Sequence, residues 1–291
     1  MKFSVNVIGY GYVGGAMGHL CKINNLPLNV HDRIKKEDSY ENFTYYADLK
    51  EMVNVSEKSS DISVYFICVP TPSDADGNCN THIVESVVSE LSTLINKNNS
   101  IVIIKSTIRV GTTRRLNSIY NVNNQFNLLF CPEFLRELTF KDDITNAKFT
   151  MFGLTDTNNT ELIDNLTDLF KNHLYKHNNS VLDTYVRKAE EFEIFKYTVN
   201  VFLSVKVWFF NEIYEVCEKF DVDYQSFKEL LPLDQRIGLS HTTVPGYHGF
   251  GFNGTCFPKD SRELRQLQES IGIPNEALTE ILNRNETFLK K

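Results

Sequence analysis

The sequence lacks the features that mark several large protein classes. Apolar runs such as 64–69 and 207–210 are far shorter than the roughly 18 residues that a membrane-spanning helix needs. The six cysteines form no C-x-x-C pair and have no histidine cluster beside them, which argues against a zinc site or a disulfide framework. No signal-peptide pattern precedes the first glycines. We therefore expect a cytoplasmic protein with no membrane contact and no bound metal.

The chain also has fewer basic than acidic residues. The chain has 30 Lys and Arg against 37 Asp and Glu, a net charge of -7. Nucleic acids and anionic membranes attract basic surfaces, so neither is expected as a partner. An anionic small ligand stays compatible, because helix N-termini and a few local cations bind phosphate even in an acidic protein.

The first part of the chain alternates short apolar runs with helical patterns such as 81–95. These runs look like strands buried on both faces of a sheet, and they span 4–9, 28–32, 64–69, 100–106, 127–132 and 149–153. Such alternation is typical of an α/β fold with a Rossmann-like, doubly wound parallel sheet. We assign this domain to residues 1–182.

The second part is helical in pattern. Residues 186 to about 220 contain no Gly or Pro, which predicts a helix of about nine turns. Further helices are predicted at 223–231, 260–271 and 275–289. We expect residues 183–291 to form a long central helix and a small helical domain for dimerisation and substrate binding.

A glycine-rich turn, G-Y-G-Y-V-G at 9–14, follows the first predicted strand and opens a helix. In that context it is the dinucleotide fingerprint, although a purely structural turn is the alternative. Gly9 would make the tight turn, Gly11 would let pyrophosphate approach the backbone, and Gly14 would allow close packing. Tyr12 and Val13 complete the motif.

Asp32 ends the next predicted strand. There it would accept hydrogen bonds from ribose hydroxyls, which favours NAD over NADP. The cations Arg33, Lys35 and Lys36 follow it and weaken that preference slightly.

Polar side chains follow three further strands. Thr71 and the pair Ser106 and Thr107 come where ligands of parallel sheets bind, although helix caps or turns would use the same residues. Glu133 and Glu137 lie four residues apart and would share one face of a helix. They are candidate acid/base groups, or a solvated helix face.

The second domain adds a polar pair and a thiol. Lys196 and Asn200 lie one turn apart in a mostly apolar segment, so they face something specific, or the lysine extends to solvent. Cys256 ends a loop with three glycines and precedes Lys259 and Asp260. Cations and helix N-termini favour the nucleophilic thiolate form of a cysteine, whereas a buried structural cysteine is the alternative.

Together these motifs resemble the UDP-glucose 6-dehydrogenase family, within the nucleotide-sugar dehydrogenases. The matching stretches run in family order over nearly the whole chain. They are G-Y-G-Y-V-G at 9–14, V-P-T-P at 69–72, K-S-T at 105–107, P-E-F-L-R-E at 132–137, K-Y-T-V-N at 196–200, D-Q-R-I-G at 234–238 and G-T-C-F-P-K-D at 254–260.

The resemblance implies oxidation of UDP-glucose to UDP-glucuronate with two NAD per sugar, in the nucleotide-sugar metabolism that supplies polysaccharide biosynthesis. A cysteine adds to the intermediate aldehyde, and the resulting thiohemiacetal is oxidised to a thioester and hydrolysed. Cys256 would be that nucleophile, with Lys196 and Asn200 stabilising the oxyanion. Asp260 would hold the lysine and a water, and Glu133 or Glu137 would activate the hydrolytic water.

The remaining residues would bind ligands. Thr71, Thr107 and Lys259 join the glycine-rich turn and Asp32 on the cofactor side. Arg236, Phe134, Leu135, Tyr247, Gly251 and Gly254 would bind the substrate.

The chain also departs from the family pattern. Phe250 and Asn253 stand where the family has Gly or another small residue. Family members carry a third, C-terminal domain that holds uridine, and we expect this chain to lack it. A homodimer through the central helix is expected.

Three alternatives stay open. One is a dehydrogenase of GDP-mannose or UDP-N-acetylmannosamine, and another is a non-catalytic NAD-binding partner subunit. The third is a β-hydroxyacid dehydrogenase, which would share the first domain but would not need Cys256.

Overall fold

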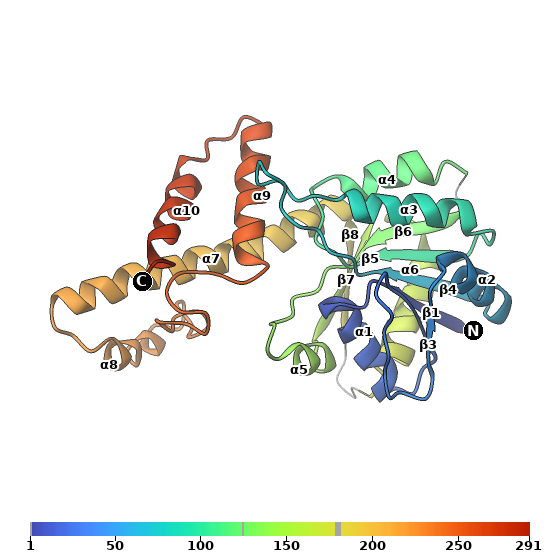
Figure 1. Ribbon diagram of the computed structural model, residues 1–291, viewed down its shortest axis with the longest axis horizontal. Helices are drawn as coiled ribbons and strands as arrows, with labels where there is room; N and C mark the ends of the chain where they lie inside the picture. Colours follow the sequence, from blue (N-terminus) through green and yellow to red (C-terminus); the bar gives the residue numbers. More distant parts are fainter. Residues whose placement is uncertain (1, 124, 178–181) are drawn as a thin grey trace. The chain divides into compact units, whose positions relative to one another are not determined.

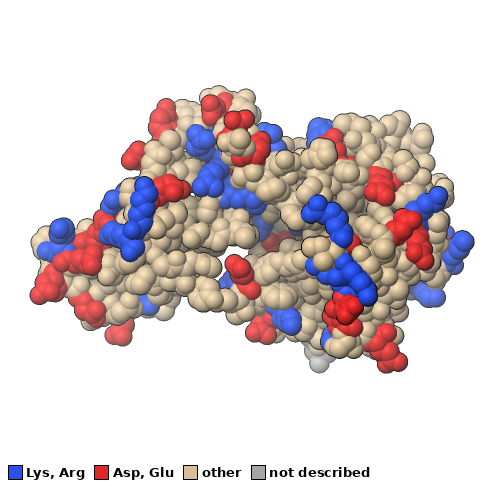
Figure 2. Space-filling view, in the orientation of Figure 1, with Lys and Arg blue, Asp and Glu red and all other residues tan. Residues whose placement is uncertain are grey.

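The computed structural model describes residues 2–123, 125–177 and 182–291 and divides the chain into two compact units (Figure 1). Unit 1 comprises Met1–Thr71 and Asn80–Lys196, and unit 2 comprises Pro72–Cys79 and Tyr197–Lys291. The domain boundary expected after residue 182 rests on sequence texture and stays a prediction. Basic and acidic side chains are interspersed over both units on the face shown in Figure 2.

Unit 1 is built around one eight-stranded sheet in the order β3-β2-β1-β4-β5-β6-β7-β8. The strands are β1 Phe3–Ile8, β2 Leu28–His31, β3 Phe43–Tyr46, β4 Ile62–Ile67, β5 Ser100–Ile104, β6 Phe126–Phe130, β7 Phe149–Leu154 and β8 Asp183–Lys188. All neighbours pair in parallel except β6 and β7, which are antiparallel. The predicted Rossmann-like fold is confirmed, with a single antiparallel pairing in a sheet predicted to be parallel.

Helices cover both faces of this sheet (Figure 1). They are α1 Tyr12–Ile23, α2 Leu49–Ser59, α3 His82–Leu94, α4 Thr112–Tyr120, α5 Phe140–Thr145 and α6 Thr160–Asp168, which continues into a π-helical turn at Leu169–Leu174. Alternate residues of β4 enter opposite cores: Val64 and Phe66 pack with α1 and α6, whereas Tyr65 and Ile67 pack with α2, α3 and α4. Burial on both faces explains why this strand reads as one apolar run.

The long helix α7 spans Ala189–Lys219. The prediction that it begins at residue 186 is wrong, because 186–188 complete β8, whose backbone pairs with β7. Beyond α7, unit 2 contains α8 Tyr224–Lys228, a 3-10 turn at Leu231–Leu233, α9 Phe257–Ser270 and α10 Glu276–Phe288. Helix α9 begins three residues earlier than predicted, since Pro258 suits a first turn.

Candidate functional site

The glycine-rich turn of unit 1 joins β1 to α1. Gly9 has a φ of +86°, a conformation that favours glycine, and its N–H donates to His31 O at 2.8 Å. A β-carbon on Gly14 would lie 2.0 Å from Gly9 O, so α1 packs against the turn only without a side chain there. A β-carbon on Gly11 would meet nothing within 4 Å. The N-terminus of α1, which includes Tyr12 and Val13, therefore has open space beside Gly11, and a helix N-terminus is a favourable place for an anion.

Asp32 follows β2 beside this turn. Its Oδ2 accepts from Tyr10 N–H at 2.7 Å and its Oδ1 accepts from Ile34 N–H at 2.9 Å. Burial by itself raises the pKa of Asp32, but these hydrogen bonds lower it below its usual value overall. The carboxylate is thus ionised at neutral pH.

The other predicted hydroxyls lie at the same edge of the sheet. Thr71 is buried beyond β4, and Thr107 is half-buried beyond β5. Ser106 Oγ donates to Val69 O at 2.7 Å and so ties the two strand ends together. Because β1, β4 and β5 run in parallel, these residues share the carboxyl edge with the glycine-rich turn.

The segment after β6 is not helical, so Glu133 and Glu137 do not share a helix face as predicted. In a helix, Glu133 O would accept from the N–H of Glu137, but here it accepts from Lys196 Nζ at 2.6 Å. The same Nζ lies 4.7 Å from the centre of the Phe134 ring. Leu135 packs against the core, whereas Glu137 is exposed in a turn.

Lys105 is a residue of this edge that the sequence reasoning missed. It follows β5, its side chain is 0% exposed, and it forms an ion pair with the Glu133 carboxylate. Its Nζ also lies 3.2 Å from Cys131 Sγ. The available signal was a lysine directly after four apolar residues of a buried strand.

Unit 2 contains the candidate thiol. Five of the six cysteines are buried, whereas Cys256 is exposed at the N-terminus of α9. One turn further on, the buried Asp260 accepts from Lys259 Nζ at 2.5 Å and from Asn200 Nδ2 at 2.5 Å. Burial lowers the pKa of Lys259, but Asp260 raises it above its usual value overall. The structure thus brings Asn200, Lys259 and Asp260 together beside the first turn that begins at Cys256.

Two asparagines hold the loop before Cys256. Asn211 Oδ1 accepts from Gly251 N–H at 3.0 Å, and Asn285 Oδ1 accepts from Phe252 N–H at 2.7 Å. A β-carbon on Gly251 would lie 2.6 Å from Asn285 Oδ1, and Gly251 has a φ of +72°. Neither asparagine was predicted, because their partners lie 40 and 33 residues away in sequence.

The other proposed substrate residues of unit 2 are less enclosed. Arg236 pairs with Asp234 two residues earlier, and its side chain is 89% exposed. Tyr247 is 76% exposed. Gly254 has a φ of +83° and lies beside His248. The ligand roles of Arg236 and Tyr247 stay predictions.

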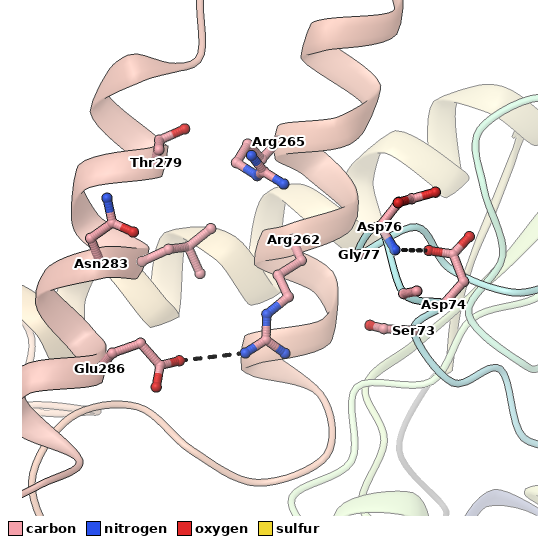
Figure 3. A pocket seen from close by; sticks show the side chains of 11 residues that line it. Ser73, Asp74, Asp76, Gly77, Arg262, Arg265, Thr279, Asn283 and Glu286 are labelled. Carbon is pink, nitrogen blue, oxygen red and sulfur yellow. Dashed lines mark hydrogen bonds and ion pairs between the residues drawn. The ribbon is translucent and has the colours of Figure 1, made fainter.

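A separate groove of about 460 Å³ runs across α9 in unit 2 (Figure 3). Arg262 and Arg265 lie between residues of α10 and the loop 73–77. Arg262 approaches Glu286 at 3.5 Å, a distance that makes only a weak ion pair. No local sequence pattern indicates this groove.

Two negative findings concern the residues that the structure describes. Across 2–123, 125–177 and 182–291, no three His, Cys, Asp or Glu residues are grouped to hold a metal ion. Among the helices of those same ranges, none has the length and apolarity to cross a membrane.

Comparisons with known proteins match both parts of the chain. The chain matches the NAD binding domain of the UDP-glucose/GDP-mannose dehydrogenase family over residues 3–173 and the central domain of that family over 190–287. It is 27% identical over 309 residues to UDP-glucose 6-dehydrogenase TuaD of Bacillus subtilis, a match that covers 97% of this chain and 62% of that protein.

Solved structures show the same likeness. A UDP-glucose dehydrogenase from Pyrobaculum islandicum aligns with a TM-score of 0.80 and 26% identity, over 99% of this chain and 68% of that one. A GDP-mannose dehydrogenase from Pseudomonas aeruginosa shares the fold, with a TM-score of 0.66 and 23% identity, over 100% of this chain and 69% of that one. The NAD-binding match covers the part of the chain with the glycine-rich turn, and the central-domain match covers the part with Cys256. Together the two matches show that this chain belongs to the UDP-glucose/GDP-mannose dehydrogenase family, whose N-terminal domain binds NAD.

Proposed function

We propose that this protein oxidises the C6 hydroxyl of UDP-glucose to a carboxylate, with Cys256 as the covalent nucleophile. The proposal rests on the exposure of Cys256 at the start of α9, next to the buried Asn200 and Asp260 and the half-buried Lys259, while the other five cysteines are buried. A chain that only bound NAD would have no need of that arrangement.

The chemistry divides between the two units. NAD, when bound, accepts the two hydrides that C6 loses. The Cys256 sulfur forms a C–S bond with the C6 aldehyde, and the thiol proton moves to the C6 oxygen, which becomes the hydroxyl of a thiohemiacetal. Lys196 and Asn200 would stabilise the negative charge that develops on the C6 oxygen. Loss of the second hydride from C6 turns the thiohemiacetal into a thioester, and water then replaces the sulfur on C6, which releases the carboxylate and restores the thiol.

Asp260 keeps the polar residues of unit 2 in place. It is fully buried, and one oxygen holds Lys259 while the other holds Asn200. A buried carboxylate is stable only when it is paired and hydrogen-bonded, so this arrangement fixes the Asn200 amide in one orientation. Fixed dipoles stabilise a developing charge better than mobile ones do.

A homodimer through α7 is part of the same proposal. Phe202, Phe209 and Val216 recur every seven residues along α7 and are 66%, 47% and 52% exposed, and Phe220 is 77% exposed. Such a stripe on one helix face is typical of a helix–helix interface. The described chain leaves these side chains in water, and a second copy would cover them.

The second candidate function is the same oxidation of a different nucleotide sugar. The family description includes GDP-mannose, and the chain spans 62% of the length of TuaD, so recognition of the base is open to proposal. The same Cys256 chemistry would serve each of these sugars.

The test combines the purified protein with NAD and UDP-glucose and counts NADH against UDP-glucuronate. We expect two NADH per acid, none of the acid with Cys256→Ala, and unchanged turnover with Ser270→Ala, an exposed side chain at the C-terminal end of α9 that serves as the matched control. Acid formation by Cys256→Ala would refute the covalent mechanism. Turnover of GDP-mannose or UDP-N-acetylmannosamine in place of UDP-glucose would move the assignment to that sugar. NAD binding without any turnover would favour a non-catalytic subunit.

A further inference from the structure

We infer that Lys105 is the positioning residue of the hydrolysis step, because it holds Glu133 as the base that activates water against the thioester. This inference rests on the proposed function, which requires such a base and leaves Glu133 and Glu137 as candidates.

The side chain of Lys105 is completely buried, and its neighbours come from several parts of unit 1. Its backbone N–H donates to Ile67 O at 2.9 Å, which fixes the residue at the end of β5. Its Nζ forms an ion pair with Glu133 Oε1, lies 3.2 Å from Cys131 Sγ and lies 5.6 Å from the centre of the Phe170 ring. A lysine so enclosed cannot serve as a surface charge.

The charge of this lysine is maintained despite its burial. Burial by itself lowers the pKa of Lys105, but Cys131 and Glu133 raise it overall. Replacing a buried ion pair by apolar residues of similar size is often neutral or stabilising, so such a pair is weak evidence for stability. The preceding residues Ile101–Ile104 are all apolar and fully buried, and a fifth apolar side chain would satisfy packing equally well. A functional reason for the cation is therefore the better explanation.

Glu133 is held from two directions. Lys105 binds one carboxylate oxygen, and Lys196 Nζ donates to the backbone oxygen of the same residue at 2.6 Å. The Glu133 side chain is still 14% exposed, so part of it is open to solvent. Glu137, in contrast, is exposed in a turn. A general base needs a fixed orientation, which favours Glu133.

Hydrolysis of the thioester breaks one bond for each bond that it forms. Glu133 takes a proton from water while the water oxygen forms a bond to the thioester carbon. The C–S bond then breaks, sulfur leaves as the thiolate, and the carboxylic acid is released. No oxidant or reductant takes part, so a defect at Lys105 should appear after both hydrides have left the sugar.

The experiment compares wild type with Lys105→Met, which removes the cation and keeps the length of the side chain. Rapid mixing with UDP-glucose and NAD would follow NADH, released acid and the intact protein mass. We expect a normal first burst of NADH, acid release slowed by roughly 100-fold, in the range that general bases contribute, and a protein carrying the thioester. Lys105→Arg should restore part of the release, because it restores the cation.

A double variant, Lys105→Met with Glu133→Gln, is the control for a folding defect in the single variant. It leaves no unpaired carboxylate in the core and should fold, bind NAD and accumulate the same thioester. Acid release at the wild-type rate by Lys105→Met would overturn the inference, as would equal loss of the NADH burst and of acid release in a folded double variant. If wild type turns over no nucleotide sugar, the proposed function itself fails and the role of Lys105 fails with it.

Discussion

The packing of the glycine-rich turn leads to a prediction about Gly14→Ala. The new β-carbon would lie 2.0 Å from Gly9 O and 3.1 Å from Val7 Cγ1, whereas ordinary contacts begin at 3.4 Å. The start of α1 would have to move away from β1 by roughly 1 Å or more, and the turn cannot yield easily, because Gly9 already has a φ of +86°. Overpacking of this kind costs about 1–3 kcal/mol.

Gly11→Ala is the matched control for this prediction. Its β-carbon meets nothing within 4 Å and its φ is −87°, so the fold should lose less than about 1 kcal/mol. The methyl group would instead occupy the space that a pyrophosphate needs. We expect this variant to fold normally and to bind NAD at least tenfold more weakly.

Thermal unfolding followed by circular dichroism, with and without NAD, would check both expectations. NAD stabilises the unit that binds it, so the transition that shifts with NAD identifies unit 1 even if the units unfold separately. Gly14→Ala should lower the midpoint of that transition, and Gly11→Ala should lower only its response to NAD. An unchanged midpoint for Gly14→Ala would refute the reasoning from close packing.

Two further predictions follow from contacts in each unit. Phe209→Glu places a charge in the exposed stripe of α7 and should convert a dimer to monomers in sedimentation equilibrium, with exposed Thr255→Ala as control; a dimer that survives would exclude α7 as the interface. Burial raises the pKa of Asp143, but the hydrogen bonds from Arg136 and Thr139 lower it overall below its usual 3.8. Its stabilising effect is therefore complete above that pH and is lost as the pH falls through the lowered pKa. Asp143→Asn should cost about 1 kcal/mol at pH 7 and flatten the acid limb of the unfolding curve, and an acid limb like that of wild type would contradict this.

The central strands and the nucleotide turn could be predicted from sequence because their signals are local. Strands buried on both faces, such as β4 and β5, read as continuous apolar runs, and the spacing of Gly9, Gly11 and Gly14 needs no distant residue. The edge strand β8 carries no such signal, since its residues are mostly exposed and it lies next to a helix without an intervening Gly or Pro. Its structure depends on pairing with β7, which the local pattern cannot show.

The reactive groups of the candidate site could be predicted from sequence, whereas the contacts that hold them in place could not. The exposed Cys256 and its neighbours Lys259 and Asp260 are close in sequence, so one motif contains them. Lys105 and Glu133 meet only because β5 and β6 are adjacent in the sheet. The four-residue spacing of Glu133 and Glu137 suggested a helix, and a hydrogen bond from a lysine 63 residues away prevents one.

The assignment of Pro72–Cys79 to unit 2 has a practical consequence for protein engineering. A fragment that began at Tyr197 would lack the N–H of Cys79, which donates to the buried Glu263 at 2.5 Å, and the Asp76 carbonyl that accepts from Gln266. It would also lose Gly77, whose absent side chain leaves room for the Arg262 stem. No single cut therefore yields both units intact, and chimaeras that exchange one unit between relatives should carry this eight-residue loop together with the C-terminal half.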